Sequence, residues 1–170
     1  MGVSPRDKIF KINKAPKGRK NFVKMSYTNL NYHIVFSTKG RRPFLDEKIL
    51  ERLSHYIAGI VKNNKAKLYA INGPTDHIHL AVSLAPDICL SDFMRILKSN
   101  SSRWIHETFP ELKTFSWQDG YSAFTVSFSG MDRVIGYINN QQEHHGKLSF
   151  DEELIILLKK HNIEFDVKYI

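Results

Sequence analysis

The chain has 170 residues, of which 42% are hydrophobic and 12% aromatic, a composition that suits one globular domain with an adequate core. No apolar run approaches the roughly 18–20 residues of a membrane span, and no secretory pattern opens the chain. The single cysteine, Cys89, excludes an internal disulfide framework, so we expect a cytoplasmic protein and place Cys89 in the core.

The net charge of +8 is concentrated near the N-terminus. Residues 1–24 hold eight basic side chains and one acidic one, so the rest of the chain is nearly neutral. These residues lack an apolar period, and we expect residues 1–25 to form a disordered basic extension and residues 26–170 to form the domain. Such an extension either holds a phosphate backbone without sequence preference or is only a solvated leader.

Apolar residues recur with two different periods along the domain. Alternation, as over residues 30–36, predicts strands, and a spacing of three and four, as over residues 49–60, predicts helices. In chain order the predicted elements are a strand over residues 30–36, a helix capped by Asp46 and ending near Asn63, strands over residues 67–71 and 76–84, a helix capped by Ser91, a strand over residues 121–128, a helix over residues 131–144 and a short helix over residues 150–161.

The first six of these elements follow the order of the split βαβ, ferredoxin-like sandwich. We therefore predict an α+β fold with an antiparallel four-stranded sheet, helices on one face of the sheet, and further helices at the C-terminus. This fold occurs in proteins of many activities, so it implies no function by itself.

The third predicted strand carries Asp76, His77, Ile78 and His79 in succession. Because side chains alternate along a strand, the two histidines share the face opposite Ile78. If the helices cover only the apolar face, both imidazoles lie on the open face, where together they can hold a metal ion. A pair of surface histidines is the alternative. His33, on the first strand, is expected to have a structural role.

Tyr137 and Gln141 lie four positions apart on the predicted helix over residues 131–144, so their side chains share one face. A phenol next to an amide carbonyl offers a nucleophile beside a further metal ligand. The alternative for the tyrosine is half-buried packing. His144 and His145 fall on the same helical face and offer other ligands.

Several stretches of the chain resemble the single-tyrosine HUH transposases of small bacterial insertion sequences. The matching stretches are YTNLNYHIVFSTKGRRP at residues 27–43, DHIHL at residues 76–80, WQDGYSAFTVS at residues 117–127 and VIGYINNQ at residues 134–141. By this resemblance His77 and His79 are the histidines of the HUH motif, Tyr137 is the catalytic nucleophile and Gln141 is the third metal ligand.

The resemblance implies a metal-dependent DNA strand transferase that uses Mg²⁺ or Mn²⁺ and needs no nucleotide cofactor. Its expected substrate is single-stranded DNA with hairpin ends, which it cleaves and rejoins through a 5′-phosphotyrosine in DNA transposition. The family also implies a homodimer, in which the tyrosine of one subunit can act at the histidines of the other.

Two basic clusters are the candidates for phosphate contacts, one after the first strand and one on the second predicted helix. They consist of Lys39, Arg41 and Arg42, and of Arg95, Lys98 and Arg103.

Three other interpretations are weighed against the transposase. Replication initiators and relaxases share the chemistry but are longer. A domesticated endonuclease that cuts repeated genomic hairpins would carry the same catalytic residues. A non-catalytic nucleic-acid-binding module on this fold would display aromatic side chains on the open sheet face, whereas the third strand carries His77 and His79 there.

Overall fold

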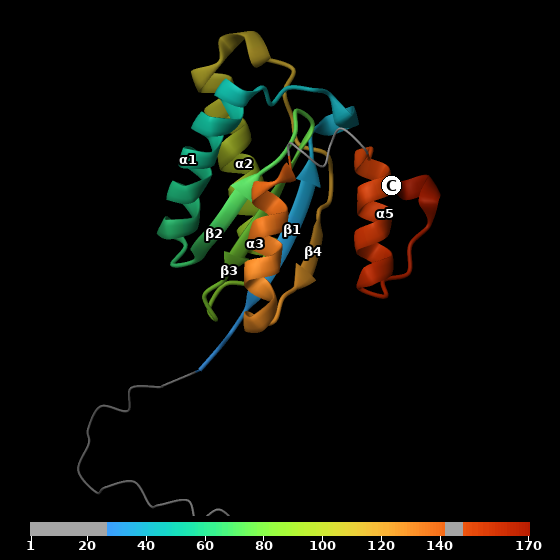
Figure 1. The fold of residues 1–170 in the computed structure, drawn as a ribbon. Helices are drawn as coiled ribbons and strands as arrows, with labels where there is room; N and C mark the ends of the chain where they lie inside the picture. Colours follow the sequence, from blue (N-terminus) through green and yellow to red (C-terminus); the bar gives the residue numbers. More distant parts are fainter. Residues whose placement is uncertain (1–26, 142–147) are drawn as a thin grey trace, which may run out of the picture.

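The computed structural model describes residues 27–141 and 148–170 (Figure 1). The basic extension expected over residues 1–25, and the candidate ligands His144 and His145, lie outside the described residues. Among the helices that the structure describes, none is both long and apolar enough to cross a membrane.

Four strands form one antiparallel sheet in the order β2-β3-β1-β4. The elements are β1 (Asn31–Ser37), α1 (Glu47–Asn63), β2 (Lys67–Asn72), β3 (His77–Ser83), α2 (Leu90–Thr108), β4 (Ser122–Thr125), α3 (Met131–Asn139) and α5 (Phe150–Lys160). Chain order and strand order are those of the split βαβ sandwich, so the predicted α+β ferredoxin-like fold is confirmed.

The first face of the sheet packs against α1 and α2. Ile34, Phe36, Ile78 and Leu80 alternate along the two central strands and are almost completely buried in this layer, as their period-two spacing predicts. α1 begins where expected, because the carboxylate of Asp46 accepts a hydrogen bond from the backbone N–H of Ile49.

The start of α2 differs from the prediction. The N-cap position is Cys89 instead of Ser91, and no side chain caps the helix. Cys89 is exposed rather than buried in the core, because its neighbours Ile88 and Leu90 pack against the core instead. The Cys89 thiol donates a hydrogen bond to the carboxylate of Asp92.

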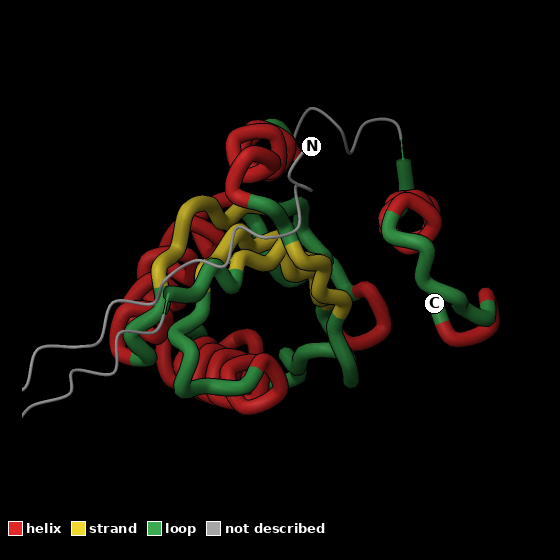
Figure 2. The backbone as a smooth tube through the Cα atoms, turned by 90° about the horizontal axis from the view of Figure 1, so that it is seen from below, coloured by secondary structure: helices red, strands yellow, loops and turns green. Residues whose placement is uncertain are grey.

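The second face of the sheet is also covered, which corrects the expectation of an open face (Figure 2). α3 packs over β2 and β3, where the small side chains of Ala70 and Ala81 leave room for Met131 and Ile138. α5 contributes a second apolar cluster on this face, over β1 and β4. That cluster consists of Val35, Phe124, Phe150, Leu157 and Leu158.

Two elements near the site are shorter than predicted. β4 ends at Thr125, because a turn of 3₁₀ helix over Phe128–Gly130 follows it. α3 ends at Asn139, and Asn140 leaves helical geometry with φ −95° and ψ 17°. Two successive asparagines favour such an end, since their side chains compete with the helix for backbone hydrogen bonds.

Candidate active site

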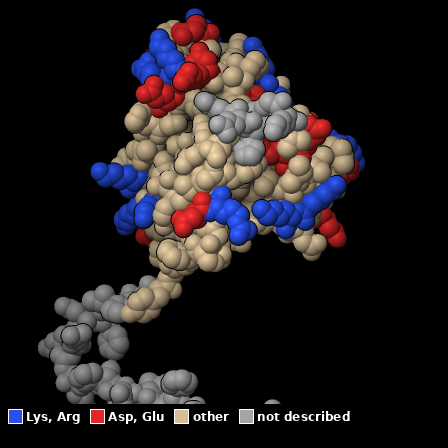
Figure 3. Space-filling model, viewed as in Figure 1, with Lys and Arg blue, Asp and Glu red and all other residues tan. Residues whose placement is uncertain are grey.

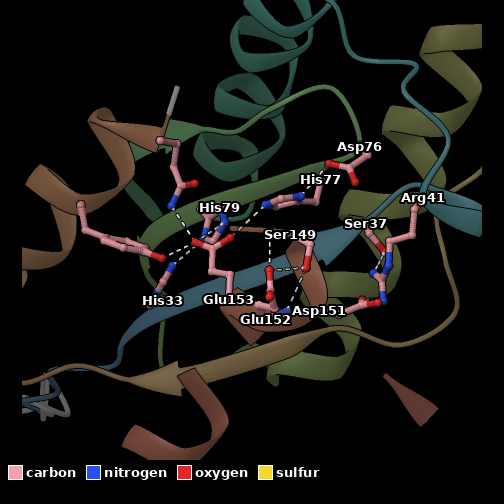
Figure 4. Close-up of polar contacts among 12 residues, drawn as sticks. His33, Ser37, Arg41, Asp76, His77, His79, Ser149, Asp151, Glu152 and Glu153 are labelled. Atoms are coloured by element: carbon pink, nitrogen blue, oxygen red, sulfur yellow. Dashed lines mark hydrogen bonds and ion pairs between the residues drawn. The ribbon is translucent and has the colours of Figure 1, made fainter. Parts of the chain in front are cut away.

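His77 and His79 project from β3 into the layer between the sheet and the helices α3 and α5 (Figure 4). Both side chains are completely buried, so the alternative of a surface pair is wrong. Gly73 lets the chain before β3 pass close to the backbone of His77, because a Cβ at that position would lie 2.2 Å from the backbone oxygen of His77. Only glycine allows the turn before β3 to pass so close.

The outer nitrogen of each imidazole has a fixed partner. Nδ1 of His77 lies 2.8 Å from a carboxylate oxygen of Asp76, and Nδ1 of His79 lies 3.0 Å from Nε2 of His33. Partners of this kind fix the ring orientation and tautomer of metal-binding histidines. Both Nε2 atoms therefore face inward, toward the same point.

A carboxylate that the sequence analysis did not anticipate occupies this point. Glu153 reaches in from α5 and is only 5% exposed. Its Oε2 lies 3.3 Å from Nε2 of His77, and its Oε1 lies 3.5 Å from Nε2 of His79. Among the described residues, these three side chains form a group whose ligand atoms all lie within 4.8 Å of one another.

Tyr137 and Gln141 meet the same carboxylate from the other side. The hydroxyl of Tyr137 donates a hydrogen bond to Oε1 of Glu153, and the amide nitrogen of Gln141 donates to the same oxygen over 3.0 Å. The ring centroid of Tyr137 lies 5.9 Å from that of His79. Gln141 is completely buried, while Tyr137 is half-buried. The residues that the sequence singled out for nucleophile and ligands thus converge within one chain.

Contacts within the cluster favour the charged forms of Glu153 and His77. Burial opposes ionisation of Glu153, but hydrogen bonds with His77 and His79 hold the pKa of its carboxyl far below the usual range. Burial also opposes protonation of His77, yet Asp76 and Glu153 raise the pKa of this imidazole. Burial and the Glu153 carboxylate together raise the pKa of the Tyr137 hydroxyl.

His33 behaves differently from His77. Burial, together with the neighbouring His79, lowers the pKa of His33 to about 3. His33 is therefore neutral at physiological pH and able to accept a hydrogen bond from Nδ1–H of His79. In that tautomer Nε2 of His79 would offer its lone pair to a metal ion, in place of its contact with Glu153.

The donor set fits a divalent ion. Two ligand atoms held at about 2.0–2.1 Å from one ion, in adjacent coordination positions, lie about 3.0–3.4 Å apart. The contact between His77 and Glu153, 3.3 Å, falls within that spacing, and the contact between His79 and Glu153, 3.5 Å, is slightly longer. In addition, His77 has a carboxylate at each ring nitrogen, an arrangement that calls for a cation.

Glu153 escaped the sequence analysis, although a signal for it exists. The buried residues Phe150, Leu157 and Leu158 define one face of α5, and Glu153 lies on that same face. A carboxylate on the buried face of an amphipathic helix is costly unless it is paired, so its position points to a polar site beneath the helix.

The basic cluster after β1 lies close to the site. The guanidinium of Arg41 donates a hydrogen bond to the hydroxyl of Ser37. Ser37 on β1 is the strand partner of His77 on β3. The guanidinium of Arg41 also forms an ion pair of 2.7 Å with Asp151 and lies 3.9 Å over the ring of Phe150. Lys39 and Arg42 are exposed beside it.

The cluster on α2 lies across the sheet from the histidines, because α2 packs on the first face. Arg95 pairs there with Asp92 on its own helix, and Arg103 donates to Asn100. Lys98 donates to the backbone oxygens of Gln118 and Gly120. Contacts of either cluster with DNA remain predictions.

Comparison with known proteins identifies the family. Residues 26–141 match the family model described as "Transposase IS200 like". The chain belongs to the IS200-like transposase family. It is therefore a transposase, and membership of this family implies cleavage and transfer of DNA strands.

Sequence alignments with relatives extend over about two thirds of this transposase. It is 27% identical over 119 residues to the ISDra2 transposase TnpA of Deinococcus radiodurans, an alignment that spans 67% of this chain and 85% of the relative. It is 28% identical over 120 residues to the transposase for insertion sequence element IS200 of Salmonella typhimurium, over 68% of this chain and 78% of the relative.

Solved structures resemble the transposase as well. A crystal structure of a putative transposase from Deinococcus radiodurans superposes with a TM-score of 0.57 at 28% identity, over 75% of this chain and 98% of that one. A REP-associated tyrosine transposase bound to a REP hairpin superposes with a TM-score of 0.56 over 73% of each chain. At 18% identity the second likeness concerns the fold alone.

The family match ends at Gln141, so α5 and Glu153 lie beyond it. The transposase thus brings a carboxylate from outside the matched region to the histidines within it.

Proposed function

We propose that this transposase cleaves and rejoins single-stranded DNA with Tyr137 as the nucleophile, at a divalent metal ion held by His77 and His79. Gln141 and Glu153 would complete the protein's share of the ligands. The observation that carries the proposal is the convergence of these side chains on one buried point within a single chain.

The hydroxyl oxygen of Tyr137 would attack the phosphorus of one phosphodiester. A new bond forms between the tyrosine oxygen and phosphorus, and the bond from phosphorus to the 3′ oxygen of the preceding nucleotide breaks. The products are a 5′-phosphotyrosine and a 3′-hydroxyl, which takes up a proton. Before attack Oε1 of Glu153 accepts the hydrogen bond of the phenol, and this oxygen would take the phenolic proton as the new bond forms. When bound, the ion supplies positive charge that polarises a phosphate oxygen.

Rejoining would reverse the same step. A 3′-hydroxyl from different DNA attacks the phosphotyrosine, the bond from phosphorus to the new strand forms, and Tyr137 is released. Because the covalent link retains the reactivity of the original phosphodiester, no nucleotide cofactor is required. Histidine nitrogens suit Mn²⁺ and carboxylate and amide oxygens suit Mg²⁺, so the donor set supports either ion.

The proposed substrate is a single strand with hairpin ends. The related tyrosine transposase was solved with a REP hairpin, which supports a hairpin for this chain. A homodimer in the cytoplasm, with one tyrosine for each of two DNA ends, is the proposed working form. A domesticated endonuclease that acts on repeated genomic hairpins would use the same residues, and the DNA that flanks the gene distinguishes the two.

The test uses end-labelled single strands that carry hairpins from the DNA flanking the gene. We expect a protein-linked product on denaturing gels with Mg²⁺ or Mn²⁺, and none with chelator. His77→Ala and His79→Ala should abolish the product and leave hairpin binding mostly intact. If either variant forms the product at the wild-type rate, the assignment of the metal ligands is wrong.

A further inference from the structure

A cavity of about 370 Å³ opens between α3 and α5, and Tyr137 and His33 are part of its wall. Its volume lies within the range of small-ligand sites. His77, His79 and Gln141 are completely buried, whereas Tyr137 is half-buried and borders this cavity. The cavity, which we call the α3–α5 cavity, is therefore an approach to the proposed nucleophile that requires no displacement of either helix.

The walls of the α3–α5 cavity combine apolar and cationic side chains. Val126, Val134, Ile156 and Leu157 supply apolar surface, and Arg133 and Lys160 supply positive charge. No acidic residue is among the described residues that line it. On the face seen in Figure 3, Lys and Arg side chains lie over the lower ends of α3 and α5, with acidic side chains beside them.

The two cations of the cavity are available to an anion. Both Arg133 and Lys160 are exposed, and neither is paired with a carboxylate of the described part of the chain. His161, which also lines the cavity, stacks on Phe124 with ring centroids 4.4 Å apart. Burial, reinforced by Lys160, lowers the pKa of His161, so this ring is a neutral aromatic surface at physiological pH.

A second cavity, of about 280 Å³, lies near Arg41 and does not share these properties. Asp119 is part of its wall, and the guanidinium of Arg41 is already paired with Asp151. Tyr137 does not line it. Of the two cavities, only the α3–α5 cavity joins unpaired positive charge to the proposed nucleophile.

We propose that the α3–α5 cavity is a nucleotide subsite, which receives the base next to the cleaved phosphate while Arg133 and Lys160 contact the neighbouring phosphates. The inference rests on the proposed function of Tyr137, because a nucleotide joined to the phosphate under attack must lie beside the attacking hydroxyl. Bases offer flat apolar faces to apolar and aromatic walls, and phosphates offer negative charge to a cationic rim. The subsite was not anticipated from the sequence, where Arg133 and Lys160 belong to neither basic cluster.

The test measures equilibrium binding of a short fluorescein-labelled oligothymidylate to the full chain by fluorescence anisotropy, in chelator so that no cleavage occurs. Ile156→Trp fills the cavity from a side chain that is already 51% exposed, and the double variant Arg133→Ala/Lys160→Ala removes its cations. We expect Ile156→Trp to weaken binding about 5–150-fold, the range that corresponds to losing one stacked base. The double variant should also weaken binding, because it removes two phosphate contacts.

Two matched variants control for general effects of size and charge. Ile163→Trp adds the same bulk at a position 42% exposed and outside the cavity, and Lys159→Ala removes a neighbouring charge that does not line it. Both should bind within about twofold of the wild-type protein, because neither side chain belongs to the stacking surface. Thermal unfolding establishes that all four variants are folded.

Equal binding by the cavity variants and their controls overturns the subsite, as does a wild-type protein that does not bind the oligonucleotide. The result is separable from the test of the catalytic proposal. A covalent product with cavity-independent binding refutes only the subsite, and cavity-dependent binding without any covalent product refutes only the nucleophile.

Discussion

The hydroxyl of Tyr137 donates a hydrogen bond to the carboxylate of Glu153, although the two residues belong to different helices. The same carboxylate faces His77 and His79. One side chain therefore joins the proposed nucleophile to the proposed metal-binding histidines. Because the family match ends at Gln141, this link is supplied by a helix that the shared domain does not include.

Glu153→Gln should weaken Mn²⁺ binding at least about 10-fold, since even supporting residues around a metal contribute 10–100-fold. The substitution keeps the shape of the side chain and removes its charge. Titration of the DNA-free protein with Mn²⁺, followed by electron paramagnetic resonance, measures the affinity directly.

Glu164→Gln is the matched control, because Glu164 is exposed and lies outside the cluster. It should bind Mn²⁺ as the wild-type protein does. If Glu153→Gln binds equally well, the carboxylate is a neighbour of the metal site and not a ligand.

The metal-free protein should be most stable near pH 6.5. His33 has a folded-state pKa of about 3 against an ordinary value of 6.5, so below pH 6.5 the unfolded chain binds a proton that the folded chain does not, and stability falls. The raised pKa of His77 gives stability that is present below pH 6.5 and lost as pH rises through its folded-state pKa. Melting temperatures between pH 5 and 8, in chelator, test this.

His33→Phe separates the two limbs of that profile. The variant keeps a ring in the buried position and removes the acceptor for Nδ1–H of His79, so the loss of stability below pH 6.5 should shrink while the loss above it remains. Mn²⁺ affinity should fall about 10–100-fold. An unchanged affinity together with an unchanged acid limb would show that His33 only fills space.

Local patterns in the sequence predict part of this site. Alternation along β3 places His77 and His79 on one face. The spacing of four predicts that Tyr137 and Gln141 lie near each other, and they do, although α3 ends at Asn139 between them. The approach of Glu153 depends instead on how α5 docks across the sheet, a long-range packing event that no local period encodes. The covering of the second face was missed for the same reason, since the alanines that admit α3 come from two different strands.

Arg41 should exchange its partner Asp151 for DNA phosphate. The ion pair is partly exposed, so Asp151→Asn should cost at most about 1 kcal/mol of stability. It should leave Arg41 freer to bind phosphate and tighten binding of single-stranded DNA.

Arg41→Ala should reduce the slope of log affinity against log salt by about 1. Anisotropy titrations at several salt concentrations measure both, with Lys48→Ala on α1 as the control. A slope that Arg41→Ala leaves unchanged removes Arg41 from the DNA surface.

Each subunit of a dimer should carry its own complete site. Within one chain the rings of Tyr137 and His79 lie 5.9 Å apart, so no second copy is needed to bring nucleophile and ligands together. Mixed dimers of Tyr137→Phe and His77→Ala should therefore recover no cleavage. Recovery, with heterodimers verified by differential tagging, would mean that the tyrosine acts at the histidines of the partner subunit.

The location of the covalent link tests the central claim most directly. The wild-type protein is incubated with hairpin-bearing single-stranded DNA and Mn²⁺, digested with protease and nuclease, and analysed by mass spectrometry. The account predicts one modified peptide, in which the oxygen of Tyr137 carries the 5′ phosphate of the cleaved strand, and no such peptide from Tyr137→Phe. A cleaved strand linked to any other residue, or cleavage that persists in Tyr137→Phe, would contradict it.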